Sequence, residues 1–494
     1  MEMPFTGPSY QAISPIIDDE IAMNCFSEVA ESPNAASKFA LRRTPGRKVF
    51  ATLPEGKVPF GFTVNGRTFW AGSNLYETNA GGAITNWGSL GATPVAPTMM
   101  VANETQLAIL NNGNLYVFTF ATNTLIAVNM AQFNGPIAQI SFCDGYVIAT
   151  LQNSHTFQQS NLEDATTWQG LNVATLSYFP DNIVSQSVIY RVPWFFSAKR
   201  AIGYYNSGAG FPVFIPIQGA QVEHGSGAMS SIVQSADTLL WLEQDDNGAM
   251  VARRLDGYTG TRVSTHAVEL AWQQFATTSD AIGWSYQQEG HYFACFYFPT
   301  ANASWCYDVT ESKTAGVALW HQRGAWIQAA GIYVADLAMS HTFNFGKHLV
   351  GDWSSGNIYW LSSTFYDDAG AMIRGWRRSP TITKENKWIY FDQIEFVMAT
   401  GLIPSTPLYD GLGQIRPAQI QLRWSNDGGQ TWSNWYFLSV GKQGEYNKRV
   451  IKRMLGRGRK RLWDVVWTDP YPFAFNGAFL EADGELAKNR KTAS

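Results

Sequence analysis

The sequence predicts an all-β protein, with a β-propeller-like body followed by a small antiparallel β-sandwich-like domain. Three observations support this prediction. Tight Asn-Gly, Asp-Gly and Gly-Asn turns recur along the chain, aromatic residues make up 14% of it, and charged residues make up only 15%. Globular chains are typically about 25% charged. Short aromatic-rich strands joined by turns of positive φ are typical of sandwiches, barrels and propellers.

The length and composition set broad limits. A chain of 494 residues has room for a large propeller and a smaller module. No run approaches 18 apolar residues, so we expect no membrane span. Residues 1–15 lack the basic and apolar regions of a secretory signal. The net charge of −4 indicates no overall attraction to nucleic acid or to a membrane surface.

Residues 1–57 are expected to form an extended N-terminal arm. Pro4, Pro8, Pro15 and Pro33 interrupt any regular element there. An arm of this kind usually crosses a neighbour or closes a ring, since it gains little order by itself.

The propeller body is expected over residues 58–384. A Gly-Asn turn followed by an apolar residue and Tyr recurs, and Leu75-Tyr76 and Leu115-Tyr116 stand 40 residues apart, the length of one blade. Later copies drift from this spacing. A period of about 40–50 residues allows about six to eight blades.

The second β module is expected over residues 385–483. Its segments 418–424 and 462–468 alternate apolar and polar side chains, as half-buried strands do. We therefore expect a small antiparallel sandwich. The polar and basic residues 484–494 are expected to be disordered.

An Asp-box is the sharpest motif of this module. In such a turn Asp and Ser cap backbone N–H groups, Gly takes positive φ, and Trp packs beneath. Asp-boxes also occur in sialidases, so a glycan-binding or glycan-hydrolysing propeller is an alternative hypothesis, one that the many tryptophans also favour. The box itself is structural, and the Arg-Ile-Pro segment of sialidases is absent. Its residues are Ser425, Asp427, Gly429, Thr431 and Trp432.

No catalytic constellation is visible in the sequence. Nucleophile-elbow and phosphate-loop motifs are absent, and the seven histidines lack metal-binding spacing. We therefore predict no enzyme, no metal and no cofactor. Adjacent carboxylates are expected to be solvated turn residues rather than catalytic acids; the pairs are Asp18-Asp19, Asp245-Asp246 and Asp367-Asp368.

The four cysteines are few for this length and argue against a disulfide scaffold. Cys295 and Cys306 could face each other across a hairpin. The favoured interpretation is that they are buried free thiols in a reducing cytoplasm.

Residues 448–461 are the strongest charge feature, because eight of these fourteen residues are cationic. Clustered cations gain affinity for DNA by releasing its counterions, so the segment is a candidate contact with a DNA channel or an acidic partner. A solvated linker is the competing interpretation. The candidate contacts are Lys448, Arg449, Lys452, Arg453, Arg457, Arg459, Lys460 and Arg461.

An ordered series of motifs resembles one protein family. Ser-Asn-Leu-Glu-Asp at 160–164, Pro-Asp-Asn-Ile-Val at 180–184 and Ser-Thr-His-Ala-Val-Glu at 264–269 follow one another. This order is similar to that in the packaged-DNA stabilisation proteins of short-tailed bacteriophages, tail accessory factors that form a nozzle or hub. The resemblance covers most of the chain. The linker 401–417 and the basic segment depart from the family pattern, so no interface residue is transferred.

The resemblance implies a structural virion protein of the phage tail, assembled in the host cytoplasm as a homohexameric ring below the portal–adaptor complex. It implies that the ring forms a channel for double-stranded DNA, retains packaged DNA until ejection, and supports tail spike, fibre or needle proteins.

Overall fold

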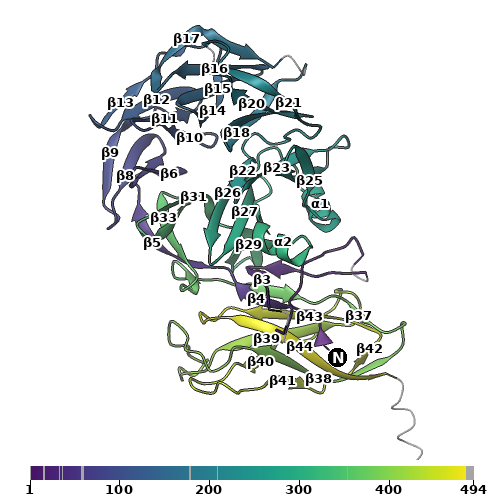
Figure 1. Cartoon of the computed structure of the whole chain (residues 1–494). Coiled ribbons are helices and arrows are strands. Elements are labelled where there is room, and N and C mark those ends of the chain that lie inside the picture. Colours follow the sequence, from purple (N-terminus) through teal and green to yellow (C-terminus); the bar gives the residue numbers. More distant parts are fainter. Residues whose placement is uncertain are drawn as a thin grey trace, which may run out of the picture.

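The computed structural model of the chain combines a ring of β-sheets with a β-sandwich on one side of the ring (Figure 1). The predicted fold class is confirmed. Within the described residues, the only α-helices are α1 (His266–Gln273) and α2 (Val309–Ala315), and neither is long and apolar enough to cross a membrane. A 3₁₀ turn covers Met130–Gln132. The structure describes residues 2–14, 17–32, 34–35, 37–56, 60–176, 180–208, 210–352 and 354–484, so the expected disordered tail falls almost wholly outside the described residues.

Seven four-stranded antiparallel blades form the ring within the described residues. The first strands of all seven line one central cavity, which makes them the innermost strands. The first three blades are β6 (Phe60–Val64), β7 (Arg67–Ala71), β8 (Asn74–Thr78) and β9 (Ile84–Ser89); β10 (Met99–Ala102), β11 (Gln106–Asn111), β12 (Asn114–Thr119) and β13 (Thr124–Ala127); and β14 (Ile137–Cys143), β15 (Tyr146–Leu151), β16 (Thr156–Asn161) and β17 (Asp164–Thr175).

The next three blades follow in the same way, and the last of them carries an additional strand, β30 (Ile332–Ala335). They are β18 (Ile183–Ile189), β19 (Val192–Ser197), β20 (Ala201–Asn206) and β21 (Phe214–Val222); β22 (Val233–Ser235), β23 (Thr238–Gln244), β24 (Met250–Asp256) and β25 (Thr259–Arg262); and β26 (Ile282–Gln288), β27 (His291–Phe298), β28 (Ala303–Asp308) and β29 (Trp320–Ile327).

The seventh blade is completed by the N-terminal part of the chain. Its first three strands are β31 (Ala338–Asn344), β32 (Lys347–Asp352) and β33 (Asn357–Ser362), and its outer strand is β5 (Gly46–Thr52), antiparallel to β33. Residues expected to form an arm therefore close the ring. Two short strands, β34 (Asp367–Asp368) and β35 (Ala371–Met372), extend this sheet.

The sandwich consists of two facing sheets. The first contains β3 (Cys25–Val29), β4 (Phe39–Arg43), β44 (Ala474–Gly484), β38 (Ile389–Met398) and β41 (Val450–Arg453), together with β1 (Glu2–Met3) and β42 (Arg457–Gly458). The second contains β2 (Ala22–Met23), β36 (Gly375–Arg378), β43 (Lys460–Trp467), β39 (Gln419–Ser425) and β40 (Tyr436–Ser439), together with β37 (Ile382–Thr383).

The sandwich core combines residues from both ends of the sequence. Met3, Phe5 and Leu41 are buried in the same apolar cluster as Phe396 and Trp463. The sandwich thus extends beyond the expected 385–483 module, and the propeller is inserted between its N-terminal and C-terminal strands.

A continuous sheet joins the propeller to the sandwich. Met23 in β2 pairs with Gln322 of β29 on one side and with Trp376 of β36 on the other. The adjacent Asn24 strengthens this junction, because its side chain donates to the Gly324 carbonyl at 2.8 Å and accepts from the Gly324 N–H at 2.9 Å. The sixth blade and the sandwich therefore share one hydrogen-bonded frame.

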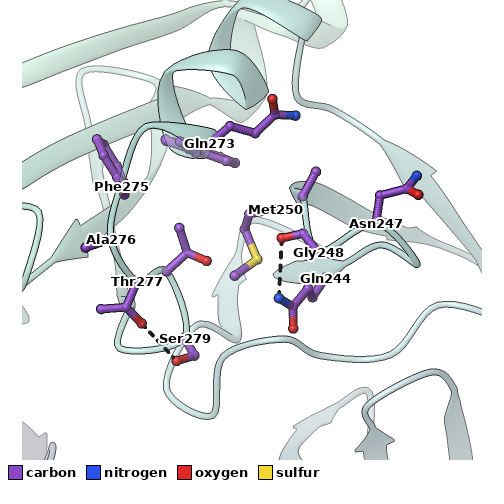
Figure 2. Close-up of a pocket in the computed structure, with 12 residues that line it drawn as sticks. Gln244, Asn247, Gly248, Met250, Gln273, Phe275, Ala276, Thr277 and Ser279 are labelled. Carbon is purple, nitrogen blue, oxygen red and sulfur yellow. Dashed lines mark hydrogen bonds between the residues drawn. The ribbon is translucent and has the colours of Figure 1, made fainter.

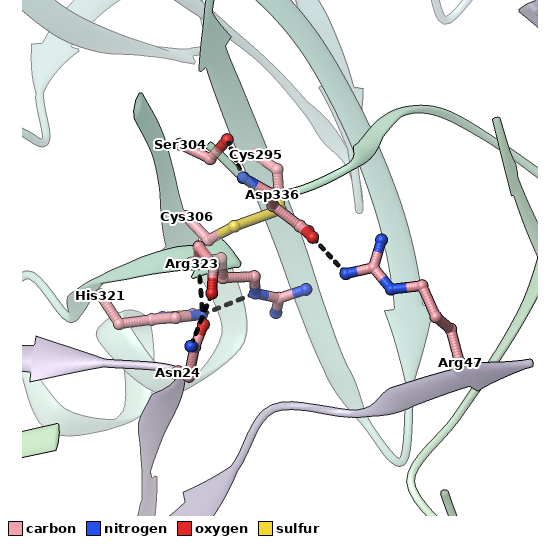
Figure 3. Close-up of a disulfide and its surroundings, with 9 residues drawn as sticks. Asn24, Arg47, Cys295, Ser304, Cys306, His321, Arg323 and Asp336 are labelled. Carbon is pink, nitrogen blue, oxygen red and sulfur yellow. Dashed lines mark hydrogen bonds and ion pairs between the residues drawn. A yellow bond between two sulfur atoms is a disulfide. The ribbon is translucent and has the colours of Figure 1, made fainter. Parts of the chain in front are cut away.

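Cys295 and Cys306 form a disulfide between β27 and β28 (Figure 3). The two residues are direct cross-strand partners with Cα atoms 4.1 Å apart. The expectation of free thiols is therefore wrong for this pair, because the hairpin register brings both side chains to the same place. Cys25 and Cys143 are buried free thiols, as expected.

Candidate functional site: the basic edge of the β-sandwich

The basic segment forms one edge of the sandwich. Strand β41 pairs with β38 so that Val450 points into the core, while the neighbouring Arg449 is exposed. A sharp turn follows, in which Met454 and Gly456 both take positive φ, of 61° and 71°. Leu455 within this turn is buried and anchors it. Apolar anchors between the cations thus hold the charged side chains at the surface. We call this surface the basic edge.

Two arginines of the basic edge are fixed by partners on β38. Arg449 forms an ion pair with Glu395 at 2.6 Å, and the Arg453 Nε donates to the Gln393 side-chain oxygen at 3.1 Å. Within the described part of the chain, no carboxylate forms an ion pair with the other surface cations, which are the exposed Lys448, Arg457 and Arg459 and the half-buried Lys452 and Lys460.

An aromatic side chain lies among these cations, although the basic segment itself contains none. The guanidinium groups of Arg457 and Arg459 lie 4.6 and 5.0 Å from the ring of Trp388, which is 40% exposed. Similarly, the Lys452 ammonium lies 4.0 Å from the ring of Tyr436. Such cation–π contacts orient the charged groups without neutralising them. The position of Trp388 beside these cations could not be predicted from the sequence, because it depends on the pairing of β38 with β42.

Arg461 differs from the other predicted contacts, because it is only 1% exposed. Its guanidinium donates to Asn426 at 2.7 Å and to the Leu455 carbonyl at 2.8 Å, and it lies 4.0 Å from the Phe391 ring. Burial lowers the pKa of Arg461 to about 9. The structure thus places Arg461 inside the sandwich, where it supports the basic edge but cannot reach a partner.

The Asp-box folds as a capped turn between β39 and β40. Asp427 accepts hydrogen bonds from the backbone N–H groups of Gln430 and Thr431 at 3.0 and 2.9 Å and from the Ser425 hydroxyl at 2.6 Å. Gly429 has a φ of 90° and donates to Ser425. Hydrogen bonds from Ser425 and then Thr431 hold the pKa of Asp427 well below its usual range.

The Asp-box packs against the residues of the basic edge. The Arg461 hydrogen bond to Asn426 connects the two, and a Cβ atom at Gly458 would lie only 2.6 Å from the Asn426 side-chain oxygen. A side chain at position 458 would therefore require the Asn426 side chain to move away from its hydrogen bond with Arg461. The ring of Trp432 rests against the guanidinium groups of Arg378 and Arg423, at 4.7 and 4.2 Å.

The central cavity of the propeller differs in character from the basic edge. It has a volume of about 480 Å³, and its lining contains no Lys, Arg, Asp or Glu. His341 at its wall is held neutral, because burial and then the neighbouring His348 lower its pKa to about 3. A DNA duplex needs neutralisation of its phosphates, and a volume of this size is typical of small-molecule sites.

No metal-binding cluster of three or more His, Cys, Asp or Glu side chains occurs among the residues that the structure describes.

The fold and this surface define a class of protein: a seven-bladed propeller inserted into a sandwich that has a charged edge and a structural Asp-box. The chain belongs to the family of Gp10 of bacteriophage P22. The β-propeller model of that family matches residues 18–366, and its β-sandwich model matches residues 376–483. The predicted membership in the packaged-DNA stabilisation proteins is thereby confirmed, and the protein is a structural component of a phage tail.

Several solved structures are similar to this chain. Virginiamycin B lyase from Staphylococcus aureus is 12% identical, with a TM-score of 0.45, over 64% of this chain and 99% of that one. The N-terminal domain of Nup159 is 9% identical, with a TM-score of 0.41, over 69% and 98% of the two chains. PorZ of Porphyromonas gingivalis is 9% identical, with a TM-score of 0.37, over 70% and 44%. No curated protein matches the chain.

Proposed function

We propose that the protein assembles as a homohexameric ring in the phage tail, below the portal–adaptor complex, where it forms a channel for double-stranded DNA and retains packaged DNA until ejection. Family membership alone does not indicate how the protein contacts DNA, and the basic edge is the structural feature that supports this part of the proposal. It presents five cations without ion-pair partners within the described residues, in a chain whose net charge is −4.

The DNA path runs between copies of the protein rather than through one of them. The lining of the central cavity of the propeller contains no Lys or Arg that could neutralise phosphate groups. In contrast, cations brought together from several copies around a symmetry axis would release counterions from a duplex and hold it in place. The Arg457–Trp388–Arg459 arrangement keeps two of these cations oriented toward solvent.

The rigid connection of the two domains suits assembly into a ring. Contacts that join one face of a subunit to a different face of the next close into a ring only when the rotation between subunits is fixed. The continuous sheet through β29, β2 and β36 fixes the angle between propeller and sandwich. The remaining surfaces are then free to contact the adaptor above and spike, fibre or needle proteins below, during assembly in the host cytoplasm.

Mass photometry of the purified chain, alone and with the portal–adaptor complex, tests the ring. We expect a species of six subunits of 54.8 kDa, about 330 kDa by closed cyclic symmetry. Electron microscopy of the same sample should show a closed ring. A chain that stays monomeric at micromolar concentration in both samples would contradict the proposal.

Duplex binding tests the basic edge, with fluorescence anisotropy of a labelled 30-base-pair DNA at about 50 and 200 mM salt. The triple variant Arg457→Gln, Arg459→Gln, Lys460→Gln should weaken binding and flatten the dependence of affinity on salt, by about 0.9 per lost phosphate contact. The control neutralises three exposed cations of the propeller instead, with Arg191→Gln, Lys199→Gln and Lys313→Gln. Equal losses in both variants would show that the basic edge has no special part in DNA binding.

A further inference from the structure

A pocket separate from the basic edge lies on the fifth blade, between the β23–β24 turn and the segment that follows α1 (Figure 2). Its volume is about 570 Å³, within the range of small-molecule sites. In Figure 2, Asn247 and Gln244 lie on one side, Gln273 and Phe275 lie on the other, and Met250 lies between them.

The lining of the pocket is polar but uncharged. Side-chain amides come from Gln244, Asn247 and Gln273, and hydroxyl groups come from Thr277, Thr278 and Ser279. No Lys, Arg, His, Asp or Glu lines it. Each side-chain amide can both donate and accept hydrogen bonds, and each hydroxyl group can also donate or accept one. This combination matches a ligand that is rich in hydroxyl groups and has no charge.

One part of the pocket wall is apolar and aromatic, formed by Met250, Trp272 and Phe275. Phe275 packs against Phe298 with ring centroids 5.2 Å apart, which fixes its position. Met250 and Trp272 are each only 1% exposed. The half-buried Phe275 therefore provides the aromatic surface that a ligand in the pocket could contact.

The rim of the pocket is held in shape before any ligand arrives. Asp245 accepts from the N–H groups of Asn247 and Ala249 at 2.9 and 2.8 Å, and Gly248 takes a φ of 85°. On the opposite side, the Thr277 and Ser279 hydroxyls are 3.2 Å apart and hydrogen-bonded. A fixed rim lowers the ordering cost of binding.

We propose that this pocket binds a neutral oligosaccharide. A sugar offers hydroxyl groups to the amides and a C–H face to the aromatic wall, whereas a phosphate or carboxylate would find no cation. The pocket also lacks the pair of carboxylic acids that glycoside hydrolysis requires, so the proposed activity is binding without cleavage. This inference does not depend on the ring or on the basic edge, because the pocket belongs to the propeller.

Saturation-transfer NMR and calorimetry with the full chain test the proposal, using maltotriose and N,N′-diacetylchitobiose as neutral probes and 3′-sialyllactose as a charged one. We expect a neutral probe to bind with a dissociation constant on the order of 1 mM or tighter. The double variant Asn247→Ala, Gln273→Ala should weaken that binding at least tenfold. Gln274→Ala is the matched control, since Gln274 is the next residue along the chain and lies outside the pocket lining.

Two results would overturn the proposal: no neutral probe binds at 10 mM, or Gln274→Ala weakens binding as much as the double variant does. A further arm distinguishes the source of the ligand by comparing the short oligosaccharides with a purified neutral bacterial surface polysaccharide. Tenfold tighter binding of the polysaccharide, lost in the double variant, would identify a cell-surface glycan as the ligand. Equal affinity per sugar unit would identify a free oligosaccharide.

Discussion

Arg378 and Asp464 face each other on the neighbouring strands β36 and β43, and the Arg378 Nε donates to an Asp464 carboxylate oxygen at 2.7 Å. On the other side of β43, Arg423 donates to the same carboxylate at 2.8 and 2.9 Å. Asp464 is fully buried. One carboxylate thus links three strands of the sandwich through charged hydrogen bonds, beneath the Asp-box tryptophan.

Replacing Asp464 should therefore destabilise the sandwich. Asp464→Asn keeps the shape but removes the counter-charge of Arg423 and one of the two carboxylates that pair with Arg378, the other being Asp19. Breaking a buried pair of this kind costs about 3–5 kcal/mol. Urea unfolding followed by tryptophan fluorescence measures the loss. The control is Asp246→Asn, which removes an ion pair of a 93% exposed carboxylate and should cost less than about 1 kcal/mol. Similar losses in both variants would contradict the central position of Asp464.

The Asp-box should contribute to stability and not to DNA binding. Asp427→Ala removes the acceptor of two backbone N–H groups, and loss of a cap of this kind costs about 1 kcal/mol. The pKa of Asp427 is lowered in the folded state, so its contribution is present above the ordinary pKa of Asp and is lost as the pH falls through the folded-state value. Urea unfolding and duplex anisotropy at pH 7 check both parts. A variant with native stability but weaker DNA binding would contradict this assignment.

Glu20 should make the protein less stable as the pH rises from about 5 to 8. Burial raises its pKa to about 7, against the opposing charge of Arg377, whose guanidinium lies 3.1 Å away. Between its ordinary pKa and about 7, the folded state holds more protons than the unfolded state, so unfolding becomes easier as the pH increases. Glu20→Gln removes this dependence.

The check is the melting temperature of Glu20→Gln relative to the native chain between pH 5 and 8. The difference should shift in favour of the variant as the pH increases. Arg377 keeps its hydrogen bond to the Phe5 carbonyl at 2.7 Å, so the variant should fold. Parallel melting curves across this range would show that Glu20 does not titrate in the window.

The disulfide predicts a specific pattern of thiol reactivity. When the chain is unfolded in guanidinium without reductant, iodoacetamide should modify two cysteines, Cys25 and Cys143. After reduction it should modify four, because Cys295 and Cys306 are then released. Mass spectrometry counts the additions. Four additions without reductant, from protein purified without reducing agent, would show that the pair is not bonded in solution.

The turns and blades could be predicted from the sequence because their information is local. Asn112-Gly113 between β11 and β12 takes positive φ at both residues, 49° and 78°, as the Asn-Gly motif predicts. The partner of β5 could not be predicted in this way, because β33 lies at the opposite end of the propeller sequence. The sequence of a single strand does not indicate which distant strand it pairs with.

The carboxylate pairs show the same limit. Asp246 is exposed, as expected. In contrast, Asp19 and Asp368 are buried against Arg378 and Arg47, which come from distant segments of the chain. Similarly, the basic edge was visible as a run of charges, but the burial of Arg461 depends on its position between the two sheets. The local sequence shows how many charged residues a segment contains, but it does not show which of them are exposed to solvent.

The insertion of the propeller between the strands of the sandwich has a consequence for biosynthesis. Strand β5 meets β33 while the ribosome is still producing the sandwich, so the propeller can close during translation. Strands β1 and β4 must wait for β44, the last strand made. At about 5–20 residues per second, that wait lasts roughly 20–90 s. During this time the apolar residues Met3, Phe5 and Leu41 lack their final partners, so the nascent chain exposes them to water until synthesis ends.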